Sequence, residues 1–191
     1  MTYSYQWFSA PKEISIVCPV CQKEALFQFA SVFHVEKKQD RIFFETHPAF
    51  ETTTVYDSYT YTHKFCVIFY PALNSNPELK NFLECHKGLD NSVSHLIKDK
   101  GVVFCPSCLI KRKHQLNWPQ EAYYCIDYKG QLLWAFHRPA FVSIYDYIQA
   151  KIRDRHVAGH FIYLLHIPSH FLTQHARAEV SKKMRRLLLR V

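Results

Sequence analysis

Short stretches rich in apolar residues, some alternating with polar ones, make up most of the chain up to Phe136. They are rich in β-branched and aromatic residues and are separated by turn-forming residues, a pattern typical of β-strands. They cover residues 13–21, 23–36, 40–45, 52–62, 63–70 and 101–108. Residues 121–136 add a β-hairpin that turns near Lys129–Gly130. This part of the chain is therefore predicted to be rich in strands, with at least three between residues 40 and 70.

Apolar residues recur at the helical spacing in three other segments. In residues 74–88, Asn76 can cap a helix and Pro77 fits its first position. Residues 138–154 and 176–191 each carry an apolar stripe beside a polar face, which predicts two amphipathic helices. The stripes contain Phe141, Ile144, Tyr145, Ile148 and Ile152 in the first and Val180, Met184, Leu187, Leu188 and Val191 in the second.

Together these elements predict an α+β fold. A twisted antiparallel sheet with zinc-ribbon-like cysteine knuckles is expected within residues 14–136, and helices from residue 139 onward should pack on it. The predicted domains are a β-rich, metal-binding domain with an inserted helix at 1–136 and a C-terminal helical segment at 137–191 that ends in a basic helix. A length of 191 residues is sufficient for one domain and such an appendage.

Two cysteine pairs share the pattern Cys-Pro-x-Cys. Two cysteines with this spacing on a tight turn can direct both sulfurs to one metal ion, and proline after the first cysteine stiffens the turn. Two such turns supply the four thiolates of a structural zinc site. The sequence therefore predicts one structural Zn²⁺, held by Cys18, Cys21, Cys105 and Cys108.

Other interpretations of the cysteine pairs stay open. The segment between them, 22–104, is longer than the gap of a minimal zinc ribbon. Ribbon turns favour glycine after the second cysteine, where positive φ is useful, but Gln22 and Leu109 stand there. Cys-Pro-x-Cys is also a thiol–disulfide exchange motif, and His34–Glu36 followed by the second pair matches the letters of a zinc deaminase. Both enzymatic interpretations explain the two pairs less well than one shared zinc site.

The stretches ISIVCPVC, NPELKNFLE and FCPSCLIKRKHQLNWP, followed by an aromatic hairpin, resemble the CpXC domain family, which is named for two Cys-Pro-x-Cys motifs. The resemblance covers residues 14–136. The family is mostly bacterial and functionally uncharacterised, so the resemblance implies metal ligation by the four cysteines and nothing catalytic. The absent glycines and an aromatic insert at 40–70 make this chain divergent. The segment after residue 132 is similar to the C-terminal part of other uncharacterised bacterial zinc-ribbon proteins.

Positive charge is concentrated near the end of the chain. The formal net charge is +8; residues 151–191 carry 9 Lys/Arg against 2 Asp/Glu, whereas residues 1–150 carry 15 against 14. Concentrated positive charge attracts polyanions. We therefore predict a non-enzymatic module that binds DNA or RNA through basic residues after the second cysteine pair and in the last helix. These are Lys111, Arg112, Lys113, Arg177, Lys182, Lys183, Arg185, Arg186 and Arg190.

Two alternatives accompany this prediction. An interaction adaptor would use apolar and aromatic faces to bind a protein partner or a second copy of the chain. An enzyme is disfavoured, because a closed four-sulfur zinc site leaves no open position and the sequence carries no nucleotide-binding or nucleophile motif. The sequence has no signal-peptide pattern and no apolar run of about 20 residues. A cytoplasmic protein without membrane contact is therefore expected.

Overall fold

The computed structural model describes residues 11–74, 76–85, 89–90, 96–150, 164 and 167–190. Strands and helices both occur, so the predicted α+β class is confirmed. The strands are β1 (Glu13–Val17), β2 (Glu24–Phe29), β3 (Ser31–Val35), β4 (Phe50–Asp57), β5 (Thr62–Phe69), β6 (Leu89–Asp90), β7 (Lys100–Phe104), β8 (Lys111–Gln115), β9 (Tyr124–Tyr128) and β10 (Gln131–Ala135). The helices are α1 (Lys38–Thr46), α2 (Pro77–Cys85), α3 (Arg138–Gln149) and α5 (Gln174–Leu188).

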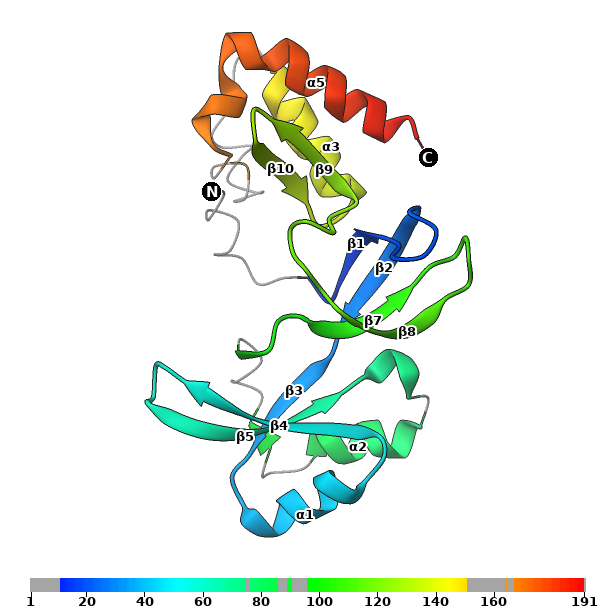
Figure 1. Ribbon diagram of the computed structural model, residues 1–191, viewed down its shortest axis with the longest axis vertical. Coiled ribbons are helices and arrows are strands. Elements are labelled where there is room, and N and C mark those ends of the chain that lie inside the picture. The colour runs from blue at the N-terminus through cyan, green and yellow to red at the C-terminus, as the bar shows by residue number, and fades with distance from the viewer. Residues whose placement is uncertain are drawn as a thin grey trace. The chain divides into compact units, whose positions relative to one another are not determined.

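The strands form three sheets, of order β1-β2-β7-β8, β4-β5-β3-β6 and β10-β9 (Figure 1). The pairs β3–β5, β3–β6, β4–β5, β7–β8 and β9–β10 are antiparallel, as predicted, but the described strands lie in three sheets rather than in the one sheet expected. The β9–β10 hairpin turns at Lys129 and Gly130, whose φ angles are 54° and 77°. Two successive positive φ angles are typical of the tight turn that matches strand twist, so the predicted turn position is confirmed.

By its internal contacts the chain forms two compact units. Unit 1 contains Met1–Leu26 and Trp118–Val191, and unit 2 contains Phe27–Asn117. A unit defined by its internal contacts is not the same as a domain that can fold alone. The predicted division into domains at 1–136 and 137–191 therefore stays a prediction.

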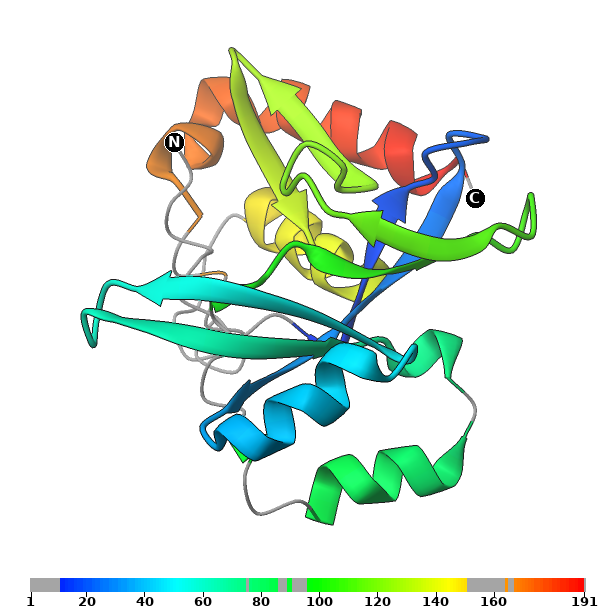
Figure 2. The ribbon, with the colours of Figure 1, turned by 60° about the horizontal axis from the view of Figure 1, so that its bottom comes forward.

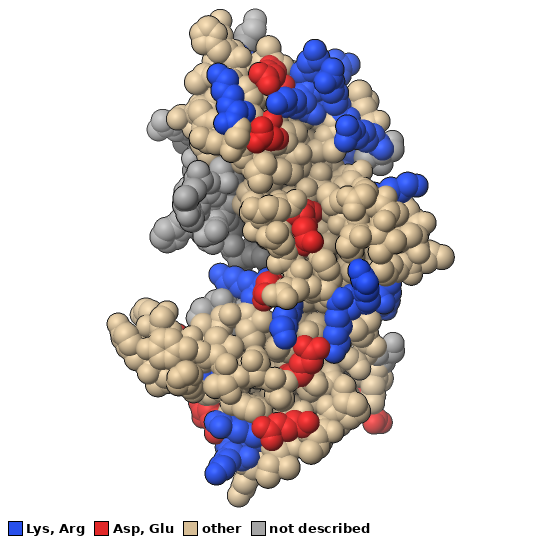
Figure 3. Space-filling model, in the orientation of Figure 1, with Lys and Arg blue, Asp and Glu red and all other residues tan. Residues whose placement is uncertain are grey.

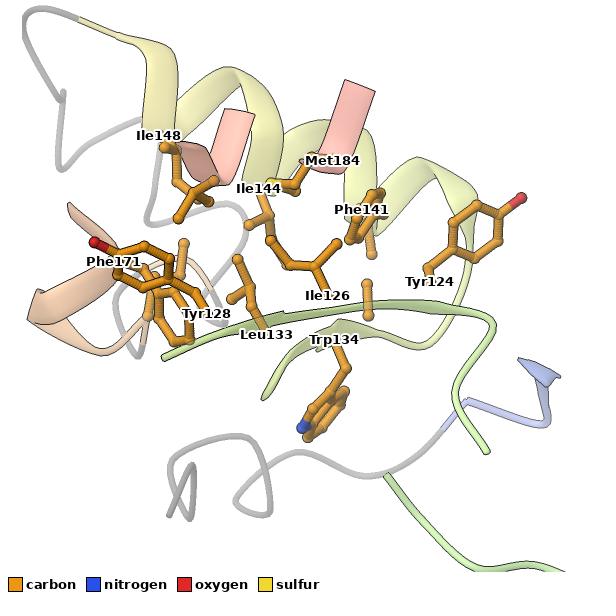
Figure 4. Packing of buried hydrophobic residues seen from close by; sticks show 14 of the residues in the cluster. Tyr124, Ile126, Tyr128, Leu133, Trp134, Phe141, Ile144, Ile148, Phe171 and Met184 are labelled. Carbon is orange, nitrogen blue, oxygen red and sulfur yellow. The ribbon is translucent and has the colours of Figure 1, made fainter. Parts of the chain in front are cut away.

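The core of unit 1 lies between the β9–β10 hairpin and the helices α3 and α5 (Figure 4). We call it the helix–hairpin core. Its fully buried members include Tyr124, Leu133, Phe141, Ile144, Ile148, Phe171, Val180 and Met184. The apolar stripes predicted for the two helices are thus the buried faces, while Ile152 and Val191 lie outside the described residues.

Both helices of this core begin with a side-chain cap. The His137 Nδ1 atom accepts a hydrogen bond from the N–H of Ala140 at 3.2 Å, and the Thr173 hydroxyl accepts one from the N–H of Ala176 at 3.2 Å. Caps of this kind satisfy N–H groups that have no partner inside the helix. None of the described helices is both long enough and apolar enough to cross a membrane.

Unit 2 packs apolar residues on both faces of its β4-β5-β3-β6 sheet. On one face Phe44 of α1 and Leu83 of α2 join the sheet residues Val67 and Phe69. On the other face Cys66, Ile68 and Val102 are buried together with other apolar residues. Successive residues of a strand point to opposite faces, so the two-sided burial explains why residues 65–69 are a continuous apolar run. The cap expected for α2 is present, since the N–H of Glu78 donates to Asn76 Oδ1 at 2.9 Å.

One predicted strand is a helix. Residues 40–45 lie in α1, where Phe44 is buried while Ile42 and Phe43 are 65% and 42% exposed. A strand there would have turned Ile42 and Phe44 to the same face. A run of three apolar residues does not distinguish a strand from a helix, and the flanking Lys, Gln, Arg and Glu residues favour the helix. The strand prediction for 40–45 was therefore wrong.

The middle of β7 approaches β2 too closely for a side chain. A Cβ atom on Gly101 would collide with the carbonyl oxygen of Gln28 and the ring of Phe27. Glycine has no Cβ and permits this approach. The strand that leads into the second cysteine pair can therefore lie close to its neighbour.

Candidate metal centre

Each Cys-Pro-x-Cys motif connects two strands of the β1-β2-β7-β8 sheet. The first lies between β1 and β2, and the second lies between β7 and β8. We call residues 18–23 knuckle 1 and residues 105–110 knuckle 2. Both are tight loops, so the local structure predicted from the spacing is present twice.

Knuckle 1 is closed by backbone hydrogen bonds around its first cysteine. The N–H of Cys18 donates to the carbonyl oxygen of Lys23 at 2.8 Å, and the N–H of Gln22 donates to the carbonyl oxygen of Cys18 at 3.0 Å. The N–H of Val20 points at the Cys18 sulfur, 3.4 Å away. A hydrogen bond donated to sulfur favours the thiolate form, which is the form that binds metal.

Knuckle 2 repeats the same bonds. The N–H of Cys105 donates to the carbonyl oxygen of Ile110 at 3.0 Å, and the N–H of Leu109 donates to the carbonyl oxygen of Cys105 at 2.9 Å. The two loops thus have one backbone pattern although their sequences share only the cysteines and the proline.

The residue after the second cysteine is left-handed in both knuckles. The φ angle is 62° at Gln22 and 59° at Leu109. Positive φ costs a residue with a side chain roughly 1–2 kcal/mol, and both loops adopt it without glycine. Both loops therefore adopt the positive φ for which glycine was expected, although neither has a glycine there. Strain of this kind persists where surrounding interactions enforce it, as at ligand-binding sites.

The four cysteine sulfurs meet in one cluster. All lie within 4.8 Å of one another, with Cys18 and Cys105 buried and Cys21 and Cys108 half-buried. Four sulfurs at about 2.3 Å from a central Zn²⁺ are about 3.8 Å apart in a tetrahedron, whereas a disulfide needs about 2.05 Å. The prediction that two pairs far apart along the chain supply one cluster is confirmed, and this cluster could hold a metal ion.

Cys66 and Cys125 lie outside the cluster, where Cys66 is buried and Cys125 is half-buried. Burial raises the pKa of the Cys66 thiol, and burial followed by the charge of Asp127 raises the pKa of the Cys125 thiol to about 11. Raised pKa values keep both cysteines protonated near neutral pH, and protonated thiols are poor nucleophiles and poor ligands. Both act as small apolar residues in the packing.

The described residues do not form the arrangement that a zinc deaminase or a thiol-exchange site requires. Among the described residues, neither His34 nor Glu36 belongs to a group that could hold a metal ion; His34 lies in β3, paired with Cys66 and Asp90. Knuckle 2 leads into β8 rather than into a helix. A thiol-exchange motif is helped by a helix N-terminus that lowers the thiol pKa, and neither knuckle opens a helix.

The first predicted basic group, Lys111–Lys113, lies on β8. This strand forms one edge of its sheet, and all three side chains are exposed. Lys113 is engaged, since its Nζ atom bonds Glu51 Oε1 at 2.5 Å and lies 4.6 Å from the ring centre of Tyr70. Lysines on an edge strand also prevent pairing with another sheet, so exposure alone does not assign them a ligand.

The second basic group lies on α5, except Arg190, which follows its end, and its residues divide between two environments. Lys183 donates to the carbonyl oxygen of Asp127 at 2.8 Å and pairs with Glu179 at 3.0 Å. Arg177 is half-buried, and its Nε has no hydrogen-bond partner among the described residues. These two cations are therefore directed partly toward unit 1 itself.

The other four cations of this group are exposed. They are Lys182, Arg185, Arg186 and Arg190, and we call them the α5 basic row. Residues three and four apart share a helix face. In Figure 3, Lys and Arg atoms gather where α5 lies in Figure 1. Glu179 is the one acidic residue of α5, and it is paired with Lys183.

One polar cluster had no counterpart in the sequence analysis. Glu51 accepts hydrogen bonds from the Tyr70 hydroxyl at 2.7 Å and from Lys100 at 3.3 Å, in addition to Lys113. Partial burial opposes ionisation, but the bonds from Lys113, Tyr70 and Lys100 outweigh it and lower the pKa of Glu51. Burial and the neighbouring carboxylate raise the pKa of Tyr70. The cluster joins residues far apart along the chain, so no local pattern could reveal it.

Comparison of the chain with protein-family models, with curated proteins and with solved structures finds no match. The resemblance to the CpXC family therefore stays a prediction from the motifs.

Proposed function

We propose that this chain is a non-enzymatic, zinc-stabilised module that binds nucleic acid through the α5 basic row. The exposed position of Lys182, Arg185 and Arg186 on α5, with exposed Arg190 two residues after its end, is the observation that carries the proposal. The cysteine cluster supplies the structural part and the basic row supplies the binding part.

Zinc is the ion that best fits four sulfurs at these separations. Tetrahedral sites built from four cysteines hold Zn²⁺ or iron. Cys18 and Cys105 are buried, which suits a site with a structural role. Elemental analysis of the purified protein should find one zinc per chain. One iron per chain, with its visible absorption, would replace zinc in the proposal.

The closed ligand shell supports a non-enzymatic role. Catalytic zinc keeps a position open for water or substrate, and four cysteines leave none. The ion's chemistry would then be to hold the two knuckles together.

Nucleic acid is the polyanion that a row of arginines and lysines suits best. Arginine binds phosphate with two parallel hydrogen bonds. Exposed cations of a protein also displace the counterions condensed on a nucleic acid, and the release of these ions favours binding. Four phosphate contacts predict a slope of log affinity against log salt of about −3.6 on duplex DNA and about −2.8 on a single strand.

Fluorescence anisotropy with labelled oligonucleotides at low salt tests the proposal. The variant Lys182→Gln/Arg185→Gln/Arg186→Gln/Arg190→Gln should lose binding and most of the salt slope, with helical circular dichroism retained. A matched control removes four exposed lysines elsewhere, Lys12, Lys37, Lys38 and Lys129, and should keep most of the affinity. Equal losses in both variants would mean that only net charge matters, and absence of binding by the unmodified protein would remove the proposal.

A protein-interaction adaptor is the second candidate, and one observation favours it. Ile42 and Phe43 of α1 are 65% and 42% exposed, and Phe82 of α2 is 38% exposed with its ring centre 5.5 Å from that of Phe43. Exposed apolar residues that touch one another mark interaction surfaces. Ile42→Ser/Phe43→Ser should reduce any concentration-dependent self-association seen in light scattering. A monomer at all concentrations would remove self-association from this candidate.

A further inference from the structure

The hairpin of β4 and β5 ends in an exposed turn. Eight consecutive residue pairs join the two strands without a bulge, from Phe50–Phe69 to Asp57–Thr62. Figures 1 and 2 show the turn at the far end of this ribbon from α1 and α2. The turn residues 58–61 are all exposed.

Asp57 fixes the shape of this turn from inside. Its side chain is 2% exposed; it accepts a hydrogen bond from the N–H of Tyr59 at 2.9 Å, another from the Thr60 hydroxyl at 2.8 Å, and pairs with Lys64 at 3.0 Å. The bonds from Lys64, Thr60 and the Tyr59 N–H hold the pKa of this carboxyl well below its usual value. The one acidic side chain of the turn is thus neutralised and buried.

Two tyrosine rings stand on this turn almost fully in solvent. Tyr59 is 89% exposed and Tyr61 is 80% exposed, while Tyr56 is 51% exposed with its ring centre 5.2 Å from that of His63. Tyr61 has a φ of 56°, a conformation in which glycine or asparagine is usual. Large rings with this much exposure, on a turn that would accept a smaller residue, are unexpected for a purely structural loop.

We propose that Tyr59 and Tyr61 stack the bases of single-stranded nucleic acid. This inference rests on the proposed function and names its substrate class. Every base has a flat face that an aromatic ring can stack on, but bases are accessible only when the strand is unpaired.

The surroundings of the rings favour a nucleic acid over a protein partner. The neighbours Ser58, Thr60, Thr62 and His63 are exposed polar residues. A stable protein interface needs a continuous patch of roughly 800 Å² on each partner, with an apolar centre, whereas isolated rings on a polar background are sufficient for stacking. Within residues 57–62, no unpaired carboxylate remains to repel phosphate, because Asp57 is paired with Lys64.

Anisotropy titrations with labelled oligothymidylate, oligouridylate and a duplex of the same length test this proposal. The unmodified protein should bind the single strands more tightly than the duplex. Tyr59→Ala and Tyr61→Ala should each weaken single-strand binding on the order of five- to hundredfold, while Tyr59→Phe keeps the ring and the affinity. Tyr61→Gly removes the ring and relieves the positive φ, so it should also weaken binding without destabilising the protein.

The outcomes separate this inference from the function on which it rests. If removing the α5 basic row abolishes binding but the tyrosine variants bind like the unmodified protein, the hairpin inference is overturned and the proposed function stands. Preference for the duplex also overturns the inference. If the unmodified protein binds no oligonucleotide at low salt, both fall.

Discussion

The helix–hairpin core and the cysteine cluster differ in how far apart along the sequence their residues lie. The core takes its buried members from Ala122 to Met184, elements that follow one another in sequence. The cluster joins Cys18 and Cys21 to Cys105 and Cys108, with all of 22–104 between the two pairs. Closing so long a loop costs entropy that grows as about 1.5RT ln n. The core can therefore be stabilised by burial of residues close in sequence, whereas the two halves of the cluster are joined by the pairing of β2 with β7 and, in the proposed function, by a zinc ion.

Replacing one cysteine of the cluster should have the largest effect. It should affect the sheet that carries the cluster more than the helix–hairpin core. In small zinc modules the ion contributes about 10–16 kcal/mol. Cys105→Ser should therefore abolish metal binding and expose the amides of β1, β2, β7 and β8 to hydrogen exchange. Elemental analysis and hydrogen-exchange mass spectrometry measure the two effects. Cys66→Ala is the matched control, because it removes a buried thiol outside the cluster and should keep one ion per chain.

A chelator applied to the unmodified protein sharpens the same test. Trp118 and Trp134 contact each other at 5.0 Å between ring centres and pack in or against the helix–hairpin core. If apolar burial stabilises that core without help from the ion, tryptophan fluorescence should stay nearly unchanged while hydrogen exchange in β7 and β8 increases. Simultaneous loss of both signals would show that the ion stabilises the core as well.

A cavity in the helix–hairpin core should destabilise that core and leave the cysteine cluster intact. Phe141 is fully buried, and truncation of a buried phenylalanine to alanine costs about 3–5 kcal/mol. Phe141→Ala should lower the midpoint of urea unfolding and leave the metal content at one ion per chain. Loss of the ion in this variant would contradict the idea that the core and the cluster are stabilised independently.

Removal of a helix cap should have a smaller effect on the same core. Thr173→Ala takes away the hydroxyl that accepts from the N–H of Ala176, and the loss of such a cap costs about 1 kcal/mol. The thermal midpoint should fall, and Thr173→Ser should restore it. Because the basic row begins two turns further along α5, fraying of the first turn should leave oligonucleotide affinity nearly unchanged.

The smallest effect is expected at the knuckles and should be a gain. Gln22→Gly or Leu109→Gly relieves a positive φ, which is worth roughly 1–2 kcal/mol, but adds freedom to the unfolded chain worth about 0.5–1 kcal/mol. A net stabilisation of about 0.5–1 kcal/mol should appear in urea titrations of the metal-bound protein. Val20→Gly lies in the same loop without a positive φ and should destabilise, which makes it the control.

The cysteine cluster was predictable because its signal is local and repeated. Each Cys-Pro-x-Cys spacing defines a turn, and the second copy supplies the remaining ligands. The amphipathic faces of α3 and α5 and the turn at Lys129–Gly130 were predictable for the same reason, since period and turn chemistry are local properties.

Features that depend on tertiary context were not predictable. Residues 40–45 were predicted as a strand, because three apolar residues in a row fit both periods. The left-handed φ of Gln22 and Leu109 is enforced by the loops rather than by residue type. The separation of these cations into an exposed row, the half-buried Arg177 and the hydrogen-bonded Lys183 follows from packing within unit 1. A list of charges does not contain this information.

The distance along the chain between the two knuckles has a consequence for synthesis. At roughly 5–20 residues per second, Cys18 and Cys21 are translated about 4–17 s before Cys105. During that interval a nascent polypeptide offers an ion only half of its final ligands, and water or other thiols must fill the rest. In the proposed function, metal loading is therefore a late step of synthesis, and it can be completed only after Cys108 has left the ribosome.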